Sequence, residues 1–184
     1  MLIPPFLLMI LHIFHFENQE PLDLFFSQLC YIVNFEVIAM DVVIREAVIT
    51  DWRELNRLNS EELGYLVSES QTKEQLTKIL ADETQLILIA MYHSTVQGYV
   101  HLSNYETLYF PTLKNVMGLA VSSHFQGKSL GSQLMSAAEL WAKKQGASGI
   151  RVNSGEMRIG AHKFYEKIGY KSKKMQKNFF KQFY

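Results

Sequence analysis

Residues 118–132 read GLAVSSHFQGKSLGS, and this stretch decides how the rest of the chain is interpreted. It leads from an apolar strand through a turn of small residues into the beginning of a long helix. The first N–H groups of a helix have no partner within the helix, and the helix dipole adds partial positive charge there, so such a turn favours anions. Gly127 and Gly131 allow a ligand to approach the backbone closely. The stretch therefore predicts a phosphate-binding loop.

One known loop of this kind is the P-loop of nucleotide triphosphatases, G-x-x-x-x-G-K-[ST]. Gly127-Lys128-Ser129 reproduces its last three residues, but its first glycine would fall at position 122, where the chain has Ser122. No later apolar strand ends in an aspartate that would bind magnesium. A P-loop nucleotide-binding protein is therefore kept only as an alternative.

A second pattern, [RQ]-x-x-G-x-[GA], is typical of the phosphate loop of the GNAT superfamily, the acyl-CoA-dependent N-acetyltransferases. Gln126, Ser129 and Gly131 stand at its defined positions. Residues 161–170 read AHKFYEKIGY and resemble the final helix of that family, A-x-x-F-Y-x-x-x-G-[FY]. The chain therefore resembles a GNAT protein over residues 42 to about 181. Ser129 replaces the usual middle glycine, which would cost about 1 kcal/mol if this residue has a positive φ.

Strand and helix signals alternate from residue 42 onward. Capping-box pairs predict helix starts at Asp51, with Glu54, and at Thr72, with Gln75. A loop is expected around Pro111. The expected strands are 42–47, 85–92, 97–102, 115–121, 150–153 and 170–183, and the expected helices are 51–64, 72–81, 131–145 and 160–168, followed by a left-handed Gly169. The order β-αα-βββ-α-β-α-β matches the GNAT-like α/β fold, a mixed central sheet flanked by helices.

The resemblance implies acetyl-CoA as co-substrate and no metal. In the family, the strand before the loop separates from its neighbour, so that backbone groups can pair with the pantetheine arm; Leu119 and Val121 match these positions. The pyrophosphate would be bound by the backbone of Gln126, Gly127, Lys128, Ser129, Leu130, Gly131 and Ser132. Asn153 either contacts the pantetheine or ends its strand in a turn. The side chains of Lys128, Arg158 and Lys163 are further candidates for phosphate binding.

Tyr165 matches the family's tyrosine that protonates the departing CoA thiolate, although the same spacing suits a buried aromatic residue. The acceptor amine must lose a proton before it attacks, so a general base is also expected. Glu106, expected in a loop after the hairpin strand, is the first candidate, and His124 is an alternative. Tyr65 and Tyr105 are expected to contact the amine substrate. The sequence does not identify the acceptor.

Composition limits the domain organisation and the partners. The chain has 184 residues, enough for one domain, and 18 basic against 18 acidic residues, so no net charge attracts nucleic acid or a membrane surface. The single cysteine, Cys30, excludes an internal disulfide and favours a cytoplasmic setting. Residues 1–40 contain no Lys or Arg, and the apolar run 6–16 is too short to span a membrane. We expect an atypical extension there, either disordered or upstream of the natural start, and the acetyltransferase domain at 41–184.

These observations predict an N-acetyltransferase that moves acetyl from acetyl-CoA directly to a primary amine of a small molecule or peptide. Direct attack needs no cysteine nucleophile. The family also allows a homodimer. A non-catalytic module that binds or senses acyl-CoA remains open as an alternative from another functional class.

Overall fold

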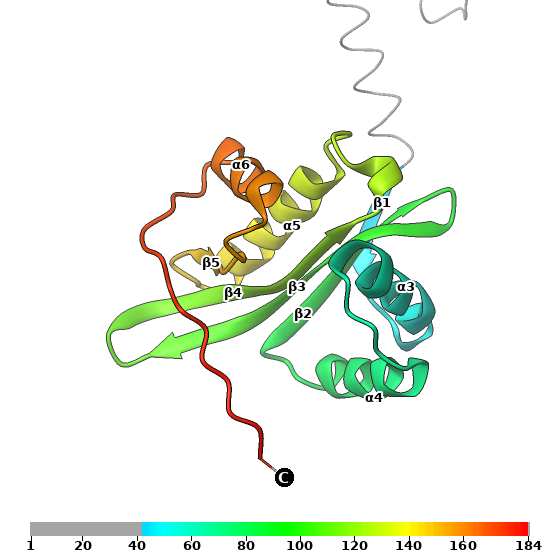
Figure 1. Ribbon diagram of the computed structural model, residues 1–184, viewed down its shortest axis with the longest axis horizontal. Coiled ribbons are helices and arrows are strands. Elements are labelled where there is room, and N and C mark those ends of the chain that lie inside the picture. Colours follow the sequence, from blue (N-terminus) through cyan, green and yellow to red (C-terminus); the bar gives the residue numbers. More distant parts are fainter. Residues whose placement is uncertain (1–41, 184) are drawn as a thin grey trace, which may run out of the picture. The chain divides into compact units, whose positions relative to one another are not determined.

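The computed structural model describes residues 42–183 (Figure 1). Residues 1–41, which include the expected extension 1–40 and Cys30, lie outside the described residues, as does Tyr184. The strands are β1 (Val42–Glu46), β2 (Gln85–Tyr92), β3 (Thr95–Thr107), β4 (Phe110–Val121) and β5 (Ile150–Val152). The helices are α3 (Trp52–Leu63), α4 (Glu69–Leu80), α5 (Leu130–Lys144) and α6 (Ile159–Lys167), with short 3-10 turns η1 (Ile49–Asp51) and η2 (Ser123–Phe125).

The strands form one mixed sheet in the order β1-β2-β3-β4-β5. Two antiparallel hairpins join β2 to β3 and β3 to β4, whereas β5 runs parallel to β4 after the crossover through α5. This confirms the expected mixed sheet flanked by helices. The expected loop around Pro111 is wrong, because β4 already begins at Phe110. Proline is tolerated there because β5 pairs with β4 only from Lys114 onward, so Pro111 lies in a stretch with one free edge.

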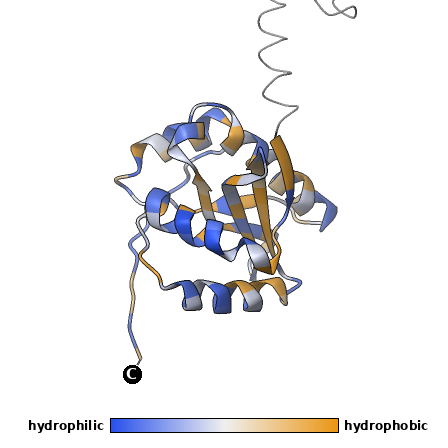
Figure 2. Cartoon of the chain, turned by 90° about the vertical axis from the view of Figure 1, so that its right-hand side faces the viewer, coloured by the Kyte–Doolittle hydropathy of each residue, from blue (hydrophilic) through white to orange (hydrophobic). Residues whose placement is uncertain are grey.

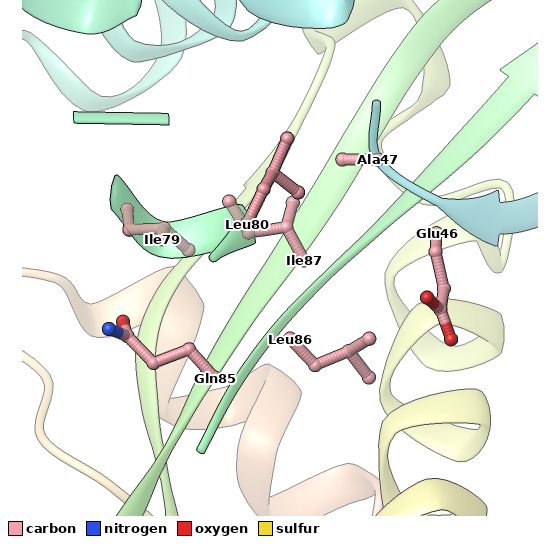
Figure 3. A pocket seen from close by; sticks show the side chains of 7 residues that line it. All are labelled: Glu46, Ala47, Ile79, Leu80, Gln85, Leu86 and Ile87. Carbon is pink, nitrogen blue, oxygen red and sulfur yellow. The ribbon is translucent and has the colours of Figure 1, made fainter. Parts of the chain in front are cut away.

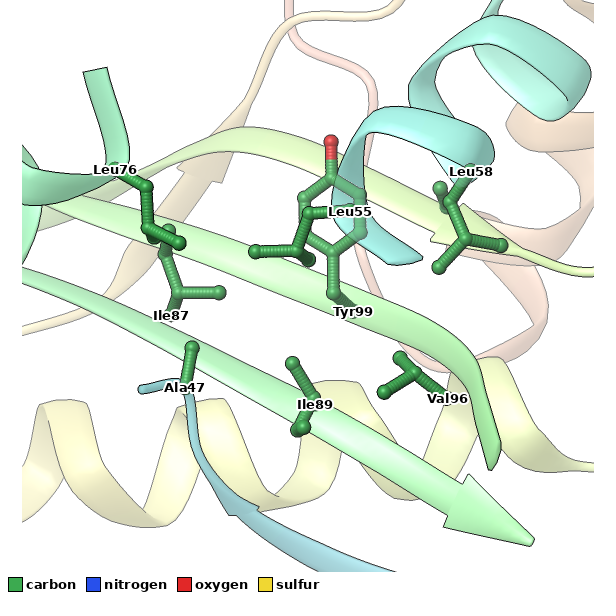
Figure 4. Close-up of a cluster of buried hydrophobic side chains, with 9 residues drawn as sticks. Ala47, Leu55, Leu58, Leu76, Ile87, Ile89, Val96 and Tyr99 are labelled. Carbon is green, nitrogen blue, oxygen red and sulfur yellow. The ribbon is translucent and has the colours of Figure 1, made fainter. Parts of the chain in front are cut away.

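Helices cover both faces of the sheet (Figure 1). On one face, α3 and α4 pack against β2 and β3 through the cluster in Figure 4, which consists of Ala47, Leu55, Leu58, Leu76, Ile87, Ile89, Val96, Tyr99 and Ala120. On the other face, α5 buries Leu130, Leu134, Met135, Ala138 and Ala142. Figure 2 shows the same division, with mainly hydrophobic strands between helices that alternate hydrophilic and hydrophobic residues. Each fully buried large side chain contributes about 1.5–3 kcal/mol of transfer free energy.

The helix boundaries agree with the sequence at some ends and differ at others. Helix α3 ends at Leu63, and Gly64 follows with φ +78°, as expected. However, the Asp51–Glu54 capping box does not form, because the Asp51 carboxylate has other partners. It accepts a hydrogen bond from the Val48 N–H (2.7 Å) and forms an ion pair with Arg45 (2.8 Å).

Helix α4 begins three residues earlier than expected. Ser68 is its N-cap and accepts the N–H of Gln71 at 3.2 Å. Thr72 instead accepts a hydrogen bond from Asn56 Nδ2 at 2.7 Å, which ties α4 to α3. The Thr72–Gln75 pair therefore lies inside the helix, and a tertiary contact uses the hydroxyl that was expected to cap it.

The expected terminal strand 170–183 is wrong. Gly169 has the predicted left-handed backbone (φ +94°), but residues 170–183 form neither helix nor strand. Five lysines and no acidic residue lie between 171 and 183, and Phe179 and Phe180 are adjacent. A strand needs its apolar residues to alternate so that they gather on one face. Adjacent phenylalanines point to opposite sides, and Met175, Phe179, Phe180 and Phe183 are exposed.

Lys114 is a buried cation in β4, with 4% of its surface exposed. Its Nζ donates to Asn104 Oδ1 and lies 4.2 Å from the centroid of the Trp141 ring. Burial lowers its pKa, partly opposed by the charge of Glu106. The folded state therefore holds this proton less tightly than the unfolded state does, which destabilises the fold at neutral pH.

We expect Lys114→Met to raise the free energy of unfolding at pH 7 by about 1 kcal/mol, because methionine keeps the length of the side chain and removes the desolvated charge. As the pH approaches the pKa of lysine in the unfolded chain, the free energy of unfolding of the wild type should rise relative to that of the variant. The difference between the two proteins should therefore be smaller at pH 10 than at pH 7. Urea unfolding at pH 7 and pH 10 measures both effects. A variant less stable than wild type at pH 7 would show that the Asn104 and Trp141 contacts outweigh the cost of burial.

Candidate functional site

The connection from β4 to α5 has the geometry that an anion site requires. Gly127 (φ +76°) and Ser129 (φ +63°) both take the left-handed backbone, and Ser129 is the N-cap of the 15-residue helix α5. The first helical bond runs from the N–H of Gln133 to the Ser129 carbonyl at 3.0 Å. The N–H groups of residues 130–132 are therefore not used within the helix and remain available at its positive end.

Ser129 does not cap these N–H groups with its side chain. Its hydroxyl donates to the Lys128 carbonyl at 2.6 Å and accepts from Gln133 Nε2 at 3.2 Å. The left-handed backbone is the unfavourable case for this serine, because a Cβ is strained there. The two local hydrogen bonds offset part of that strain.

Ser129→Gly should therefore raise the free energy of unfolding by about 0.5–1 kcal/mol, because glycine relieves the left-handed strain although it gains freedom in the unfolded chain. Thermal unfolding of the two proteins measures the effect. Ser129→Ala, which keeps the strain and loses the hydroxyl, is the matched control and should be less stable than wild type. Equal stabilities of wild type and the glycine variant would mean that the hydroxyl contacts offset the strain completely.

Strand β4 separates from β5 just before the loop. The two strands pair only at Lys114–Ile150, Asn115–Arg151 and Val116–Val152, yet β4 continues to Val121. At the same point the register between β3 and β4 shifts, since Leu102 faces Val116 but His101 faces Gly118. Met117 is thus the extra residue of a β-bulge. Beyond the bulge, no strand formed by residues 42–183 lies on the side of β4 that faced β5.

The backbone groups on this open side belong to Leu119 and Val121. Ser122 N donates to Gln97 O at 2.8 Å, and in an antiparallel pair alternate residues direct their backbone groups to the partner strand. Ala120 and Gly118 therefore point toward β3, whereas Leu119 and Val121 point away from it. Gln126 Nε2 donates to the outward Val121 carbonyl at 3.1 Å. Outward backbone groups at both residues are what the expected pairing with a ligand would require.

Glu62 at the end of α3 ties that helix to the loop. Its carboxylate accepts the Ser123 N–H at 2.8 Å and Gln126 Nε2 at 3.3 Å. Arg158, at the start of α6, donates to the Leu63 carbonyl at 3.2 Å. The end of α3 therefore contacts both the loop and the segment that leads into α6. No local pattern announces these contacts, because they join residues more than 60 positions apart.

Helix α6 packs against the beginning of α5. The Phe164 ring lies so close to Gly131 that a Cβ on this glycine would be 3.2 Å from it. The neighbouring Tyr165 is half-buried, with its ring 5.8 Å from that of Tyr170. Burial raises the pKa of Tyr165 above its ordinary value of 10.0, partly opposed by the charge of Arg158. Its phenol is therefore protonated at neutral pH and can donate a proton.

Asn153 and the three basic side chains that were expected to bind the cofactor make different contacts. Asn153 follows the end of β5, and its Oδ1 accepts from Arg151 at 2.9 Å. Lys128 Nζ lies 5.4 Å from the centroid of the Phe125 ring, and Lys163 is exposed on α6. All three of these basic side chains are exposed, and Arg158 donates a hydrogen bond to the Leu63 carbonyl at the end of α3.

The structure does not bring Glu106 to this region. It lies on β3 and not in a loop as expected, and its carboxylate accepts from Asn104 Nδ2 at 3.2 Å. Along the hairpin it is about four residues, or roughly 13 Å, past the point where β4 and β5 separate. Tyr105 stacks against Arg151 at 4.1 Å, Tyr65 is exposed after α3, and His124 is exposed in η2. Of these, the structure favours neither Glu106 nor His124 as base.

A second set of polar residues was not expected from the sequence. Gln85, His101, Asn115 and Arg151 lie on the α3/α4 face of the sheet, on four neighbouring strands. His101 stands between Val100 and Leu102 of β3, at an alternate position from Tyr99, which is the signal that sequence reasoning missed. The hollow in Figure 3 lies toward the β1 edge of the sheet, where β1, β2 and α4 meet, and Gln85 also lines it, whereas the loop and the open side of β4 do not.

Two findings for the described residues concern metals and membranes. Among residues 42–183, no three His, Cys, Asp or Glu side chains gather as metal ligands would. In the same part of the chain, none of the helices could cross a bilayer.

Comparison with known proteins identifies the family. A model of the acetyltransferase (GNAT) family matches residues 52–170, more than half of the chain. The chain belongs to the GNAT acetyltransferase family. No curated protein sequence matches this GNAT protein. The separated strands and the phosphate loop described above lie within the matched range.

Solved structures with the same fold include several acetyltransferases. Aminoglycoside N-acetyltransferase AAC(6')-Iy in complex with CoA superposes with a TM-score of 0.70 at 15% identity, covering 77% of this chain and 95% of that chain. The 6'-N-acetyltransferase AAC(6')-IG from Acinetobacter haemolyticus has a TM-score of 0.68 at 16% identity, with 77% and 99% covered. A GNAT family acetyltransferase from Staphylococcus aureus has a TM-score of 0.64 at 21% identity, with 78% and 99% covered. These likenesses establish the fold of this GNAT protein.

Proposed function

We propose that this GNAT protein transfers an acetyl group from acetyl-CoA directly to a primary amine of a small molecule or peptide. The observation that carries the proposal is the open side of β4, where the outward backbone of Leu119 and Val121 leads straight to the free N–H groups of residues 130–132. A strand-like pantetheine arm and a pyrophosphate match these two features in order. The CoA complex of a structural neighbour supports the same ligand.

Acetyl-CoA supplies an activated acyl carbon and a thiolate leaving group. The residues of this chain hold it and provide the proton. Backbone groups of Leu119 and Val121 orient the arm, and the loop amides bind the phosphates. When the amine nitrogen bonds to the acyl carbon, the carbon–sulfur bond breaks and Tyr165 donates its phenolic proton to the sulfur. Because the pKa of Tyr165 is raised by burial, this proton is in place at neutral pH.

An amine acceptor is supported by the structural neighbours. One AAC(6')-Iy structure holds a bisubstrate analogue of CoA and acetylneamine, and another aminoglycoside acetyltransferase is in complex with sisomicin. We propose an amine as the acceptor here as well, with Tyr65 and Tyr105 among the residues that contact it. The proposal also includes residues 41–184 as the catalytic domain and a cytoplasmic setting, where acetyl-CoA is available.

The first experiment is a thermal shift of the full chain with acetyl-CoA, CoA, and ATP with magnesium. A ligand at 100 times its Kd stabilises by about 2.7 kcal/mol, so both CoA ligands should raise Tm. Stabilisation by ATP with magnesium, and by neither CoA ligand, would support the P-loop alternative. The second experiment measures CoA release with a panel of primary amines. Binding of CoA without turnover of any amine would indicate a binding or sensing module.

A further inference from the structure

His101 lies at the point where the sheet opens. On β3 it faces Gly118, the first residue of β4 after the bulge, and on the other side it faces Ile87 of β2. Gly118 has no side chain, and a Cβ there would lie 3.2 Å from the Tyr99 hydroxyl. On the α3/α4 face, the Tyr99 ring of β3 therefore lies over Gly118, and β4 itself has no side chain at this position beside His101. His101 is one strand away from the open side of β4, which is the proposed path of the pantetheine arm.

Hydrogen bonds determine which nitrogen of His101 carries the proton. Gln85 Nε2 donates to Asp82 Oδ2 at 2.7 Å, and a carboxylate can only accept, so the amide nitrogen of Gln85 must face Asp82. The Gln85 oxygen consequently faces His101 Nε2 at 2.9 Å and accepts from it. His101 is thus the Nε2–H tautomer. Its Nδ1 has a free lone pair, and no hydrogen bond among residues 42–183 uses it.

A second acceptor without a partner lies on the same face. Asn115 is on β4 opposite Ser103, two residues from His101 along β3. Its Nδ2 donates to the Val116 carbonyl and the Met117 sulfur, but its Oδ1 is buried with no hydrogen-bond partner. A buried acceptor without a donor costs about 1–3 kcal/mol unless a ligand or water supplies one. Two acceptors on one face of the sheet, the partly buried His101 Nδ1 and the buried Asn115 Oδ1, therefore match a ligand that brings N–H donors.

We propose that His101 contacts the acceptor amine and takes its surplus proton through Nδ1, with Gln85 and Asp82 fixing the tautomer. This role rests on the proposed function. It assigns the base to β3 and to neither Glu106 nor His124.

The proton transfers balance in this arrangement. The neutral amine forms the carbon–nitrogen bond, and its nitrogen then has one proton more than the amide product. That proton passes to His101 Nδ1, while Tyr165 gives its own proton to the leaving sulfur. The imidazolium proton returns to the tyrosinate through solvent, which restores both residues. Burial lowers the pKa of His101 to about 4, so the resting imidazole is neutral at physiological pH. The same shift makes it a weak base, so it takes the proton only after the new carbon–nitrogen bond has made that nitrogen acidic.

Two amide substitutions separate the two nitrogens of His101. The amide of His101→Gln lies as many bonds from Cα as Nε2 does, so it can keep the contact with Gln85 but offers nothing at Nδ1. The amide oxygen of His101→Asn lies as many bonds from Cα as Nδ1 does, so it keeps an acceptor there and loses Gln85. We expect His101→Gln to lower kcat by roughly 100-fold and His101→Asn to retain more activity. The Tm shift with CoA should stay at the wild-type value in both.

A third variant, Gln85→Met, leaves the imidazole in place and removes the tautomer lock. Its loss of kcat should be smaller than that of His101→Gln. Wild-type kcat in both His101 variants would overturn the assignment. A greater loss of kcat in His101→Asn and Gln85→Met than in His101→Gln would also overturn it, because the contact with Gln85 alone would then matter. Failure of the wild type itself to acetylate any amine would overturn the proposed function and this role together, and is thus distinguishable from the first result.

Discussion

Tyr165→Phe is expected to lower kcat for acetyl transfer by roughly 100-fold or more, since a positioned general acid contributes about 100- to 10,000-fold. Phenylalanine keeps the ring that packs near Phe164 (5.2 Å) and Tyr170 (5.8 Å) and removes only the hydroxyl. The Kd for CoA should therefore be unchanged. Because burial raises the pKa of Tyr165, the wild type should also keep this proton donor to a higher pH than a tyrosine with the ordinary pKa would. Steady-state CoA release at saturating amine measures kcat.

Tyr170→Phe is the matched control. Tyr170 belongs to the same aromatic group, and burial together with the nearby Glu139 carboxylate raises the pKa of its hydroxyl, so this hydroxyl is a poor candidate for the acid and its removal should leave activity close to wild type. Wild-type kcat in Tyr165→Phe would contradict the acid role and indicate that Tyr165 is a packing residue. Equal losses in both tyrosine variants would indicate a structural effect of this aromatic group.

The fold follows from the sequence wherever one local signal decides the outcome. Gly64 and Gly169 take the left-handed backbone because no other nearby residue suits that position at a helix end. Strand 85–92 matches β2 residue for residue, since an apolar run between a turn and His93-Ser94 has no competing interpretation. The start of α4 could not be predicted in this way. Ser68 and Thr72 are both good caps, and the hydrogen bond from Asn56 on α3 uses Thr72.

The same distinction between local signals and contacts across elements applies to the candidate site. The β4–α5 loop and the outward backbone of Leu119 and Val121 are properties of one continuous stretch, so local sequence predicts their geometry, and their roles in binding stay predictions. The contacts of Glu62 with Ser123 and of Gln85 with His101 join separate elements. The prediction for Glu106 was wrong for a different reason. We expected it in a loop, but it lies on the long strand β3, and no local pattern reveals how long this hairpin is.

Gly131→Leu is expected to weaken CoA binding by about 5- to 150-fold. The Cβ alone would come within 3.2 Å of the Phe164 ring, so a leucine must displace α6 from the beginning of α5. Overpacking of this kind costs about 1–3 kcal/mol, and each 1.4 kcal/mol corresponds to a tenfold change in Kd if the strain is relieved at the loop. Since α6 carries Tyr165, kcat should fall as well. Isothermal titration with CoA and CoA release at saturating substrate measure the two effects.

Gly160→Leu provides the matched control, because Gly160 lies on α6 and a Cβ there meets no atom within 4 Å. This variant should bind CoA like the wild type. The double variant Gly131→Leu/Phe164→Ala removes the ring that the leucine meets, and it should recover part of the lost affinity, as a double-mutant cycle requires for two residues in contact. Wild-type affinity in Gly131→Leu would mean that α6 can move without disturbing the loop. In that case the packing of Phe164 on Gly131 could not be what places Tyr165 beside the bound thioester.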